Sequence, residues 1–279
     1  MKESILLVLK GIIIGIANII PGVSGGTLMI TLGIYEDVID TISHFFKNFK
    51  KNLKFLIPLG IGMVLAILIL SKLISVCLDK YPFPTTLFFI GLIIGGIPFI
   101  WKKTSAAKKN YSNWLVFLIT FAIVVTFAFL KSGDFVVDLN SLTPVGYITL
   151  FLIGMVSAAT MVVPGISGSF VLMMLGYYEP IVNTIKDLTN FSLLGHNLLI
   201  LIPFGLGIVI GIVLVAKLIE YLLHRYPVKT YYGVLGFVLA SLVAIIKPLF
   251  GITPSILEVV ISIFLVVAGG VVAYKLGDK

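Results

Sequence analysis

Two short segments of the chain carry residue types that can bind an anion. The first is Pro21-Gly22-Val23-Ser24-Gly25-Gly26-Thr27, and the second is Pro164-Gly165-Ile166-Ser167-Gly168-Ser169. A Pro-Gly pair breaks a hydrophobic helix, because proline lacks an N–H donor and glycine adds backbone freedom. The helix that restarts after the break has free N–H groups at its positive end, where phosphate binds well. The residue types therefore predict an anion site at each break.

The hydroxyl, glycine and proline residues of these segments have separate predicted roles. The predicted substrate-binding residues are Ser24, Gly25, Gly26, Thr27, Ser167, Gly168 and Ser169, and the structural breaks are Pro21, Gly22, Pro164 and Gly165. In the alternative interpretation, the serines only cap the half-helices and the glycines only permit close helix packing. The duplication favours binding, because substrate sites of inverted-repeat transporters lie at paired breaks of this kind.

A tyrosine–glutamate pair follows each break. Leu32-Gly33-Ile34-Tyr35-Glu36 recurs, at the same offset as the breaks, as Leu175-Gly176-Tyr177-Tyr178-Glu179. A carboxylate in or near a membrane can carry a coupling proton if desolvation raises its pKa. Glu36 and Glu179 are therefore candidate coupling residues. In the alternative, each lies at the membrane interface and caps a helix.

Four cations near the ends of apolar stretches are candidate contacts for an anionic headgroup. Lys72 and Lys217 are equivalent in the repeat, and they precede Lys80 and Arg225 respectively. These side chains could receive a headgroup at the two membrane surfaces. They could equally extend towards lipid headgroups without a specific ligand, which costs little near a helix end.

Residues for other kinds of chemistry are scarce. The single cysteine, Cys77, excludes an intramolecular disulfide and a cysteine-based metal site. His44, His196 and His224 are predicted to lie in loops at no metal-ligand spacing, so we expect no metal site and no cofactor. The chain contains neither H-E-x-x-H nor G-x-x-x-x-G-K-[ST]. Its single arginine also argues against a phosphatase that clamps phosphate with several arginines, so we expect no enzyme.

The composition places these residues in a membrane. The chain has 279 residues, of which 59% are hydrophobic and 11% are charged, whereas soluble domains are about half apolar and about a quarter charged. Its mean hydropathy is +1.17. The net charge of +8 is typical of cationic loops beside an anionic leaflet and does not indicate nucleic-acid binding. We predict an all-α integral membrane protein.

The apolar stretches form two copies of one plan within a single polytopic membrane domain, residues 1–279. Repeat one, 1–131, has helical stretches at 4–20 and 24–44 around its break, then spans at 55–78, 84–101 and 113–130. Repeat two, 144–279, has stretches at 145–163 and 167–185, then spans at 198–222, 230–246 and 255–275. A polar link at 132–143 joins them.

The distribution of lysines predicts how the two copies are oriented. If each broken pair enters and leaves on one side, as a re-entrant hairpin or as two full spans, each copy crosses an odd number of times. The second copy is then inverted, and most cations fall on one side, which the positive-inside rule assigns to the cytoplasm with both termini. Stretch 4–20 is short for a span, which favours hairpins. We therefore expect two inverted-topology repeats, each with a broken helix pair plus three transmembrane helices.

The doubled segments, each followed by Leu-Gly-x-Tyr-Glu, resemble those of the PopT-type translocases of undecaprenyl phosphate, bacterial membrane domain of unknown function family 368. The similarity covers essentially the whole chain. The positions carried over are Pro21, Gly22, Ser24, Gly25, Gly26, Thr27, Glu36, Pro164, Gly165, Ser167, Gly168, Ser169 and Glu179. The second segment departs from the first, with Ser169 in the place of Gly26 and Phe170 in that of Thr27.

The resemblance implies a flippase in the bacterial cytoplasmic membrane. Its substrate would be undecaprenyl phosphate, the polyprenyl carrier of cell-wall synthesis, returned from the outer to the inner leaflet. The expected partners are this lipid and the membrane lipids around it, and a homo-oligomer is compatible with the sequence. A proton or other cation entering with the head would reduce the charge moved, which carries about 2.3 kcal/mol per charge and 100 mV. The alternatives are an anion or proton-coupled ion channel with the same half-helix N-termini and a membrane phosphatase.

Overall fold

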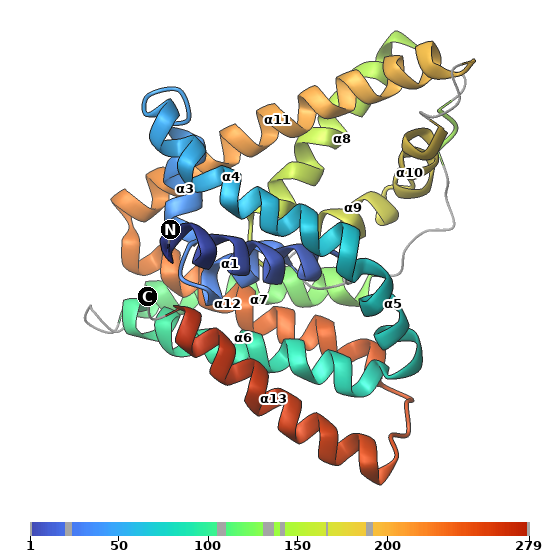
Figure 1. Ribbon diagram of the computed structural model, residues 1–279. Helices are drawn as coiled ribbons and strands as arrows, with labels where there is room; N and C mark the ends of the chain where they lie inside the picture. The colour runs from blue at the N-terminus through green and yellow to red at the C-terminus, as the bar shows by residue number, and fades with distance from the viewer. Residues whose placement is uncertain are drawn as a thin grey trace.

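The structure is a computed structural model that describes residues 2–19, 24–104, 110–130, 137–139, 143–165, 167–187 and 192–277. These residues form helices and no strand (Figure 1). Seven helical segments within them are long and apolar enough to cross a membrane: 49–70, 82–104, 111–129, 144–162, 194–225, 227–249 and 256–277. The chain is a multi-pass membrane protein.

The helices follow the order expected from the two sequence copies. The first copy contains α1 (Lys2–Ile19), α2 (Gly25–Thr31), α3 (Tyr35–Ser43), α4 (Phe49–Leu65), the π-helical turn η1 (Ala66–Leu70), α5 (Ser71–Lys80), α6 (Pro82–Thr104) and α7 (Tyr111–Phe129). The second contains α8 (Pro144–Val162), α9 (Gly168–Met174), α10 (Tyr178–Lys186), α11 (Leu194–Arg225), α12 (Pro227–Ile246), the 3-10 turn η3 (Lys247–Leu249) and α13 (Ile256–Gly277).

The helical stretch after each break is divided in two, which corrects the continuous stretches predicted at 24–44 and 167–185. Gly33 separates α2 from α3 with a φ of 67°, and Gly176 separates α9 from α10 with a φ of 74°. A positive φ is the left-handed conformation that ends a helix, and glycine adopts it without a steric penalty. The glycine of each Leu-Gly-x-Tyr-Glu motif therefore turns the chain.

Equivalent residues of the two copies have nearly the same backbone. The φ and ψ angles are −95° and 124° at Ser24, and −95° and 127° at Ser167. They are −134° and 57° at Tyr81, and −136° and 54° at Tyr226. One element differs, because α11 runs unbroken where the first copy contains α4, η1 and α5. The sequence repeat thus extends to local structure.

Glycines let the first helix of each copy pack closely on the fourth helix of the same copy. α1 packs along α4 where Gly11 faces Gly62, and α8 packs along α11 where Gly154 lies against Phe204 and Gly207 lies against Phe151. A Cβ at any of these glycines would overlap a carbonyl oxygen of the facing helix. Small residues permit such backbone contact between membrane helices.

Long helices of each copy also pack on long helices of the other copy. α6 of the first copy packs along α13 of the second, and α12 of the second packs along α7 of the first. The largest core cluster contains buried side chains of α2, α6 and α12, such as Leu28, Ile93 and Leu235. The two copies are therefore joined by one hydrophobic core.

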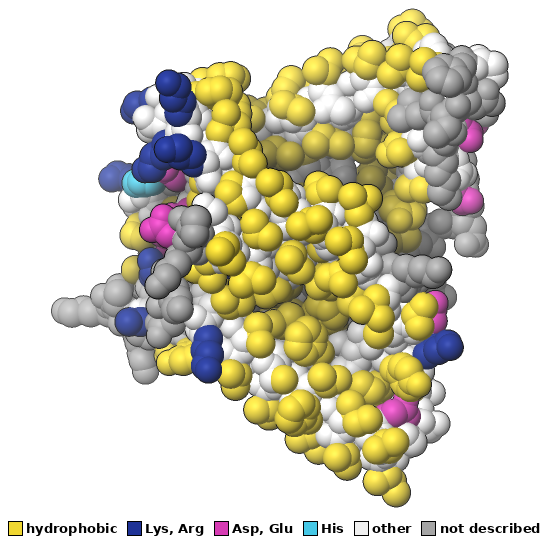
Figure 2. Space-filling model, in the orientation of Figure 1, with side chains coloured by type: hydrophobic (Ala, Val, Ile, Leu, Met, Phe, Trp, Pro, Cys, Tyr) yellow, Lys and Arg dark blue, Asp and Glu magenta, His cyan; other side chains and the backbone are white. Residues whose placement is uncertain are grey.

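One end of the molecule collects the chain ends and most of the visible cations. The beginning of α1 and the end of α13 lie there, with the turns between α3 and α4 and between α11 and α12 (Figure 1). Figure 2 shows Lys and Arg side chains at this end and hydrophobic side chains over the middle. Large apolar side chains such as Leu68 and Ile263 are exposed, as expected for a surface that faces lipid.

Candidate functional site

The helix that follows the first break meets the second break inside the protein. The backbone N–H of Gly165 donates a 2.8 Å hydrogen bond to Oγ1 of Thr27, which is fully buried. Gly26 lies beside the same segment, because a Cβ placed on it would be 3.4 Å from Cα of Pro164. The beginning of α2 is therefore in contact with the end of α8. Pro21 and Gly22, the predicted first break, lie outside the described residues.

Tyr35 makes a second bond between the copies. Its buried hydroxyl donates a 3.0 Å hydrogen bond to the carbonyl of Val162, the last residue of α8. A carbonyl at a helix end lacks an intrahelical partner and needs another donor. Tyr35 has no role among the predictions from the sequence, although its place in the repeated Leu-Gly-x-Tyr-Glu motif could have indicated one.

The two serines occupy N-cap positions, but their hydroxyls do not cap the helices. Ser24 precedes α2 and Ser167 precedes α9, and neither makes a side-chain capping bond. The buried Oγ of Ser24 has no hydrogen-bond partner among the residues that the structure describes. Ser167 Oγ lies 2.8 Å from Ser169 Oγ. The two equivalent positions therefore have different hydrogen bonding.

The glycines after the breaks lie against different neighbours. A Cβ on Gly25 would be 2.5 Å from Oδ1 of Asn18, and a Cβ on Gly168 would be 3.0 Å from the carbonyl oxygen of Ser157. One side of each half-helix is therefore closely covered, by Asn18 at α2 and by Ser157 and Met161 at α9. Substrate binding by these glycines stays a prediction.

The predicted headgroup cations that the structure describes lie at the surface. Lys80, Lys217 and Arg225 are exposed, and the Arg225 guanidinium lies 5.8 Å from the centre of the Tyr226 ring. The side chain of Lys72 lies outside the described part of the structure. Among the described side chains, Lys80, Lys217 and Arg225 make no hydrogen bond with Ser24 or Ser167, and the role of all four cations remains a prediction.

Both candidate coupling carboxylates begin short helices near the surface. Glu36 lies in the first turn of α3, has a side chain 49% exposed and forms a 3.1 Å ion pair with Lys103. Glu179 lies in the first turn of α10 and is exposed. A carboxylate near a helix N-terminus is favoured by the helix dipole, but neither glutamate is the capping residue considered in the alternative, because the N-caps are Ile34 and Tyr177. Proton coupling stays a prediction.

A cavity of about 1190 Å³ lies at the other end of α2. Its wall includes Thr31 and Gly33, acidic residues of α3 and the side chains of Lys102 and Lys103. Neither Pro164 nor Gly165, the break residues that the structure describes, lines it. Partial burial, with the neighbouring Glu36 carboxylate, raises the pKa of Asp37 in this wall, outside the seven candidate spans. The negative end of α2 and several carboxylates thus share one cavity.

Lys10 is a buried cation that we did not select from the sequence. Its Nζ donates a 2.7 Å hydrogen bond to the carbonyl of Leu32, and only 3% of the residue is exposed. Leu32 is the C-terminal cap of α2, where a positive charge is favoured by the helix dipole. A lone lysine inside the apolar stretch 4–20 was the available signal. The equivalent position in the second copy is Ile153, so this cation has no counterpart.

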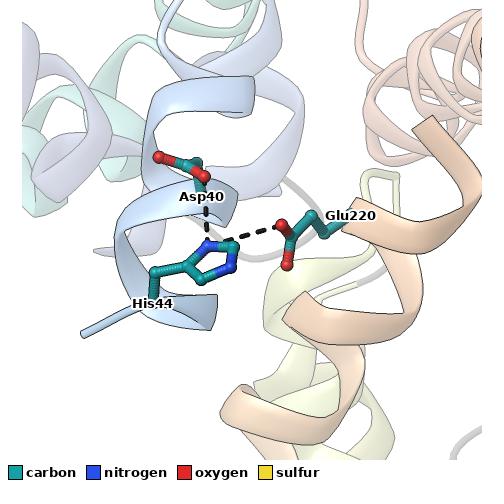
Figure 3. A group of neighbouring side chains, drawn as sticks. All are labelled: Asp40, His44 and Glu220. Atoms are coloured by element: carbon teal, nitrogen blue, oxygen red, sulfur yellow. Dashed lines mark hydrogen bonds and ion pairs between the residues drawn. The ribbon is translucent and has the colours of Figure 1, made fainter. Parts of the chain in front are cut away.

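Three side chains from both copies converge beside the cavity (Figure 3). His44 Nδ1 lies 3.2 Å from Asp40 Oδ1 and 3.4 Å from Glu220 Oε1. Asp40 and His44 belong to α3 and its C-terminal cap, whereas Glu220 belongs to α11. The prediction that the histidines lie in loops was wrong for His196 and His224, which are inside α11.

Comparison with protein families decides what the chain is related to. A family model described as undecaprenyl phosphate translocase-like matches residues 14–250. This range covers most of the chain and includes both breaks. The chain belongs to this family. The resemblance drawn from the doubled segments is thereby confirmed.

Two curated relatives carry the same name. The polyprenyl-phosphate transporter of Staphylococcus aureus (strain NCTC 8325 / PS 47) is 34% identical over 276 residues, which is 97% of this chain and 95% of the relative. That of Vibrio cholerae serotype O1 (strain ATCC 39315 / El Tor Inaba N16961) is 32% identical over 248 residues, which is 84% of this chain and 75% of the relative. No solved structure matches the chain significantly.

Proposed function

We propose that the protein flips undecaprenyl phosphate from the outer to the inner leaflet of the bacterial cytoplasmic membrane, where the lipid is reused for cell-wall polymer synthesis. Membership of the translocase-like family supports this substrate class, as do two relatives named polyprenyl-phosphate transporter. The observation that carries the proposal is the hydrogen bond from Gly165 to Thr27, because it joins the helix after the first break to the second break and so brings polar groups of both copies together.

The phosphate head binds where α2 and α9 begin. Non-helical backbone is tolerated at membrane depth where protein buries it or where it lines a water-filled cavity. Ser24 supplies a buried hydroxyl with no partner among the described residues, and the first N–H groups of each half-helix supply further donors. The polyprenyl tail stays in lipid while the head crosses. The residues that contact the head are Ser24, Gly25, Gly26, Thr27, Ser167, Gly168 and Ser169.

The two copies form inverted-topology repeats with re-entrant broken pairs. The gathering of Lys and Arg at the end that holds the first and last described residues favours this orientation (Figure 2). By the positive-inside rule that end is cytoplasmic, together with both termini. The α5–α6 and η3–α13 connections then face outwards. Such repeats allow the same site to open to either leaflet in turn.

A proton or another cation enters with the head and reduces the charge that must cross. Glu36 and Glu179 are the coupling carboxylates in this proposal, and Lys72, Lys80, Lys217 and Arg225 attract the head at the two surfaces. Moving one charge against 100 mV takes about 2.3 kcal/mol, which is the physical reason for coupling. Transport that responds neither to a pH gradient nor to membrane potential would reject this part of the proposal.

Leaflet exchange in proteoliposomes tests the function. The purified full chain is reconstituted with labelled undecaprenyl phosphate, and exchange is compared between wild type, a paired Ser24→Ala/Ser167→Ala variant and Ser262→Ala. Ser262 is also a buried membrane serine, but it belongs to α13 and bonds the Glu258 carbonyl of the same helix. We expect exchange by wild type and Ser262→Ala and at least a tenfold loss in the paired variant.

The other outcomes separate substrate from site. Exchange that survives in the paired variant keeps the substrate and moves the site elsewhere. Ion current without exchange rejects the flippase in favour of the channel. Release of inorganic phosphate from the lipid would instead identify an enzyme.

A further inference from the structure

The cluster of Asp40, His44 and Glu220 has the geometry of a metal site. We propose that these three side chains bind a divalent transition-metal ion, Zn²⁺ or Mn²⁺, which links α3 to α11. The proposal rests on the geometry and chemistry of the cluster and does not require the transport function proposed above.

The interatomic distances match those between ligands of a bound ion. Zinc bonds to histidine nitrogen and carboxylate oxygen are about 2.0–2.2 Å long, so adjacent ligand atoms of a tetrahedral site lie about 3.3–3.6 Å apart. His44 Nδ1 is 3.2 Å from Asp40 Oδ1 and 3.4 Å from Glu220 Oε1. One ligand atom from each residue lies within 4.8 Å of both others. The two distances from His44 are already close to this range, and bringing the Asp40 and Glu220 oxygens from at most 4.8 Å to a tetrahedral edge takes side-chain movement of about 1 Å or less.

The ligand types restrict the metal. One imidazole nitrogen with two carboxylate oxygens suits Zn²⁺ or Mn²⁺, whereas Cu(I) prefers thiolate or thioether ligands. Mg²⁺ and Ca²⁺ prefer oxygen ligands throughout. Three protein ligands also leave a coordination position open, as zinc sites that bind water or substrate do.

The position of the cluster gives the ion a mechanical role. Asp40 and His44 belong to the first copy and follow its break. Glu220 belongs to the second copy and lies on α11. Asp40 and Glu220 also line the cavity, together with the carboxylates of Glu36 and Asp37. Lys102 and Lys103 line the same cavity, and Lys103 pairs with Glu36, but the four carboxylates outnumber the two lysines, and this negative balance favours a cation. A bound ion would hold the broken pair of one copy against α11 of the other.

The same contacts have a second explanation without metal. A protonated His44 would lie between two carboxylates as an exposed ion pair, because 38% of the His44 side chain and 68% of the Asp40 side chain are accessible to solvent. Pairs of that kind contribute only about 0–1 kcal/mol. Metal titration separates the two explanations directly.

Isothermal titration with Zn²⁺ or Mn²⁺ tests the proposal on the full chain in detergent, purified without a polyhistidine tag and stripped with EDTA. We expect one ion per chain and at least tenfold weaker binding in His44→Gln, Asp40→Asn and Glu220→Gln. The matched control is His224→Gln. His224 lines the same cavity from the same helix as Glu220, but its Nδ1 bonds the Glu220 backbone oxygen. This control should bind as wild type does.

A second measurement guards against variants that misfold. Asp40→His replaces one metal ligand by another and should retain zinc binding, and zinc should raise the Tm of wild type and His224→Gln but not of His44→Gln. Absence of stoichiometric binding to wild type would overturn the proposal and leave the ion pair. Equal binding by His44→Gln and His224→Gln would also overturn it, because the ion would then occupy another place.

Discussion

Thr27 and Tyr35 are the residues by which the first copy completes the break of the second. Thr27 accepts from the Gly165 N–H, and Tyr35 donates to the Val162 carbonyl. The Gly165 N–H and the Val162 carbonyl have no hydrogen-bond partner within a helix, and in lipid such backbone groups must be satisfied by protein. The two side chains therefore link the stability of one half to the conformation of the other.

Replacing Thr27 by valine should weaken this link. The Gly165 N–H would lose its acceptor in a buried place, which typically costs about 1–3 kcal/mol. Thr27→Ser keeps the hydroxyl and serves as the matched control. We expect a lower Tm in detergent and slower lipid exchange for valine than for serine. Equal stability of the two variants would mean that the hydrogen bond contributes nothing.

Replacing Glu36 by glutamine separates a coupling role from a structural one. The Glu36–Lys103 pair is about half exposed, and such pairs contribute about 1 kcal/mol or less, so the Tm should change little. If Glu36 carries the coupling proton, exchange by Glu36→Gln should no longer respond to a pH gradient. Lys103→Met breaks the same ion pair but keeps the carboxylate, and should remain responsive. Loss of the response in both variants would contradict the coupling role.

At the scale of elements, glycine has two different uses. Gly33 and Gly176 end short helices through a positive φ, whereas Gly11, Gly62, Gly154 and Gly207 bring helices into contact. The second use follows from the membrane, where helices gain little from hydrophobic burial against each other and depend on close packing. The packing of α1 on α4 and of α8 on α11 is therefore the same contact, made once in each copy.

Gly207→Leu should separate α8 from α11. A side chain there would overlap the carbonyl of Phe151, whereas a Cβ on Gly205 meets no atom within 4 Å. Overpacking typically costs about 1–3 kcal/mol, so we expect a clear fall in Tm for Gly207→Leu and little change for Gly205→Leu. Similar Tm values for both would show that helix contact at Gly207 does not limit stability.

At the scale of the whole molecule, packing between helices of different copies joins the two copies. α6 packs on α13 and α12 packs on α7. The last two long helices of each copy therefore pack on those of the other copy. The hydrophobic core runs through α2, α6 and α12. Any motion that opens the breaks must therefore preserve or slide these contacts between copies.

Cysteine accessibility tests the inverted topology. Starting from Cys77→Ser, single cysteines are introduced at Lys47, Asp79, Lys229 and Ile252, and intact cells are treated with a membrane-impermeant maleimide. We expect labelling from outside at positions 79 and 252 and protection at 47 and 229. If each broken pair crossed the membrane once, positions 47 and 229 would lie on opposite sides, and that result would reject the hairpins.

The local parts of the site could be predicted from the sequence. Proline, glycine and serine act on their own backbone, so the two breaks, the N-cap positions of Ser24 and Ser167 and the repeated motif can be recognised without a fold. The sequence did not predict that Gly33 and Gly176 divide the helical stretches after the two breaks. A glycine inside an apolar helical pattern does not by itself indicate a positive φ.

The sequence alone determined that the chain lies in a membrane, that it contains two copies of one plan, and which family it resembles. Long apolar runs, periodic identities and local motifs carry that information. Only the tertiary structure decided that Thr27 meets Gly165, that α6 pairs with α13, and that Glu220 joins Asp40 and His44. These contacts join residues far apart in the chain, and their geometry depends on how the helices of both copies pack together.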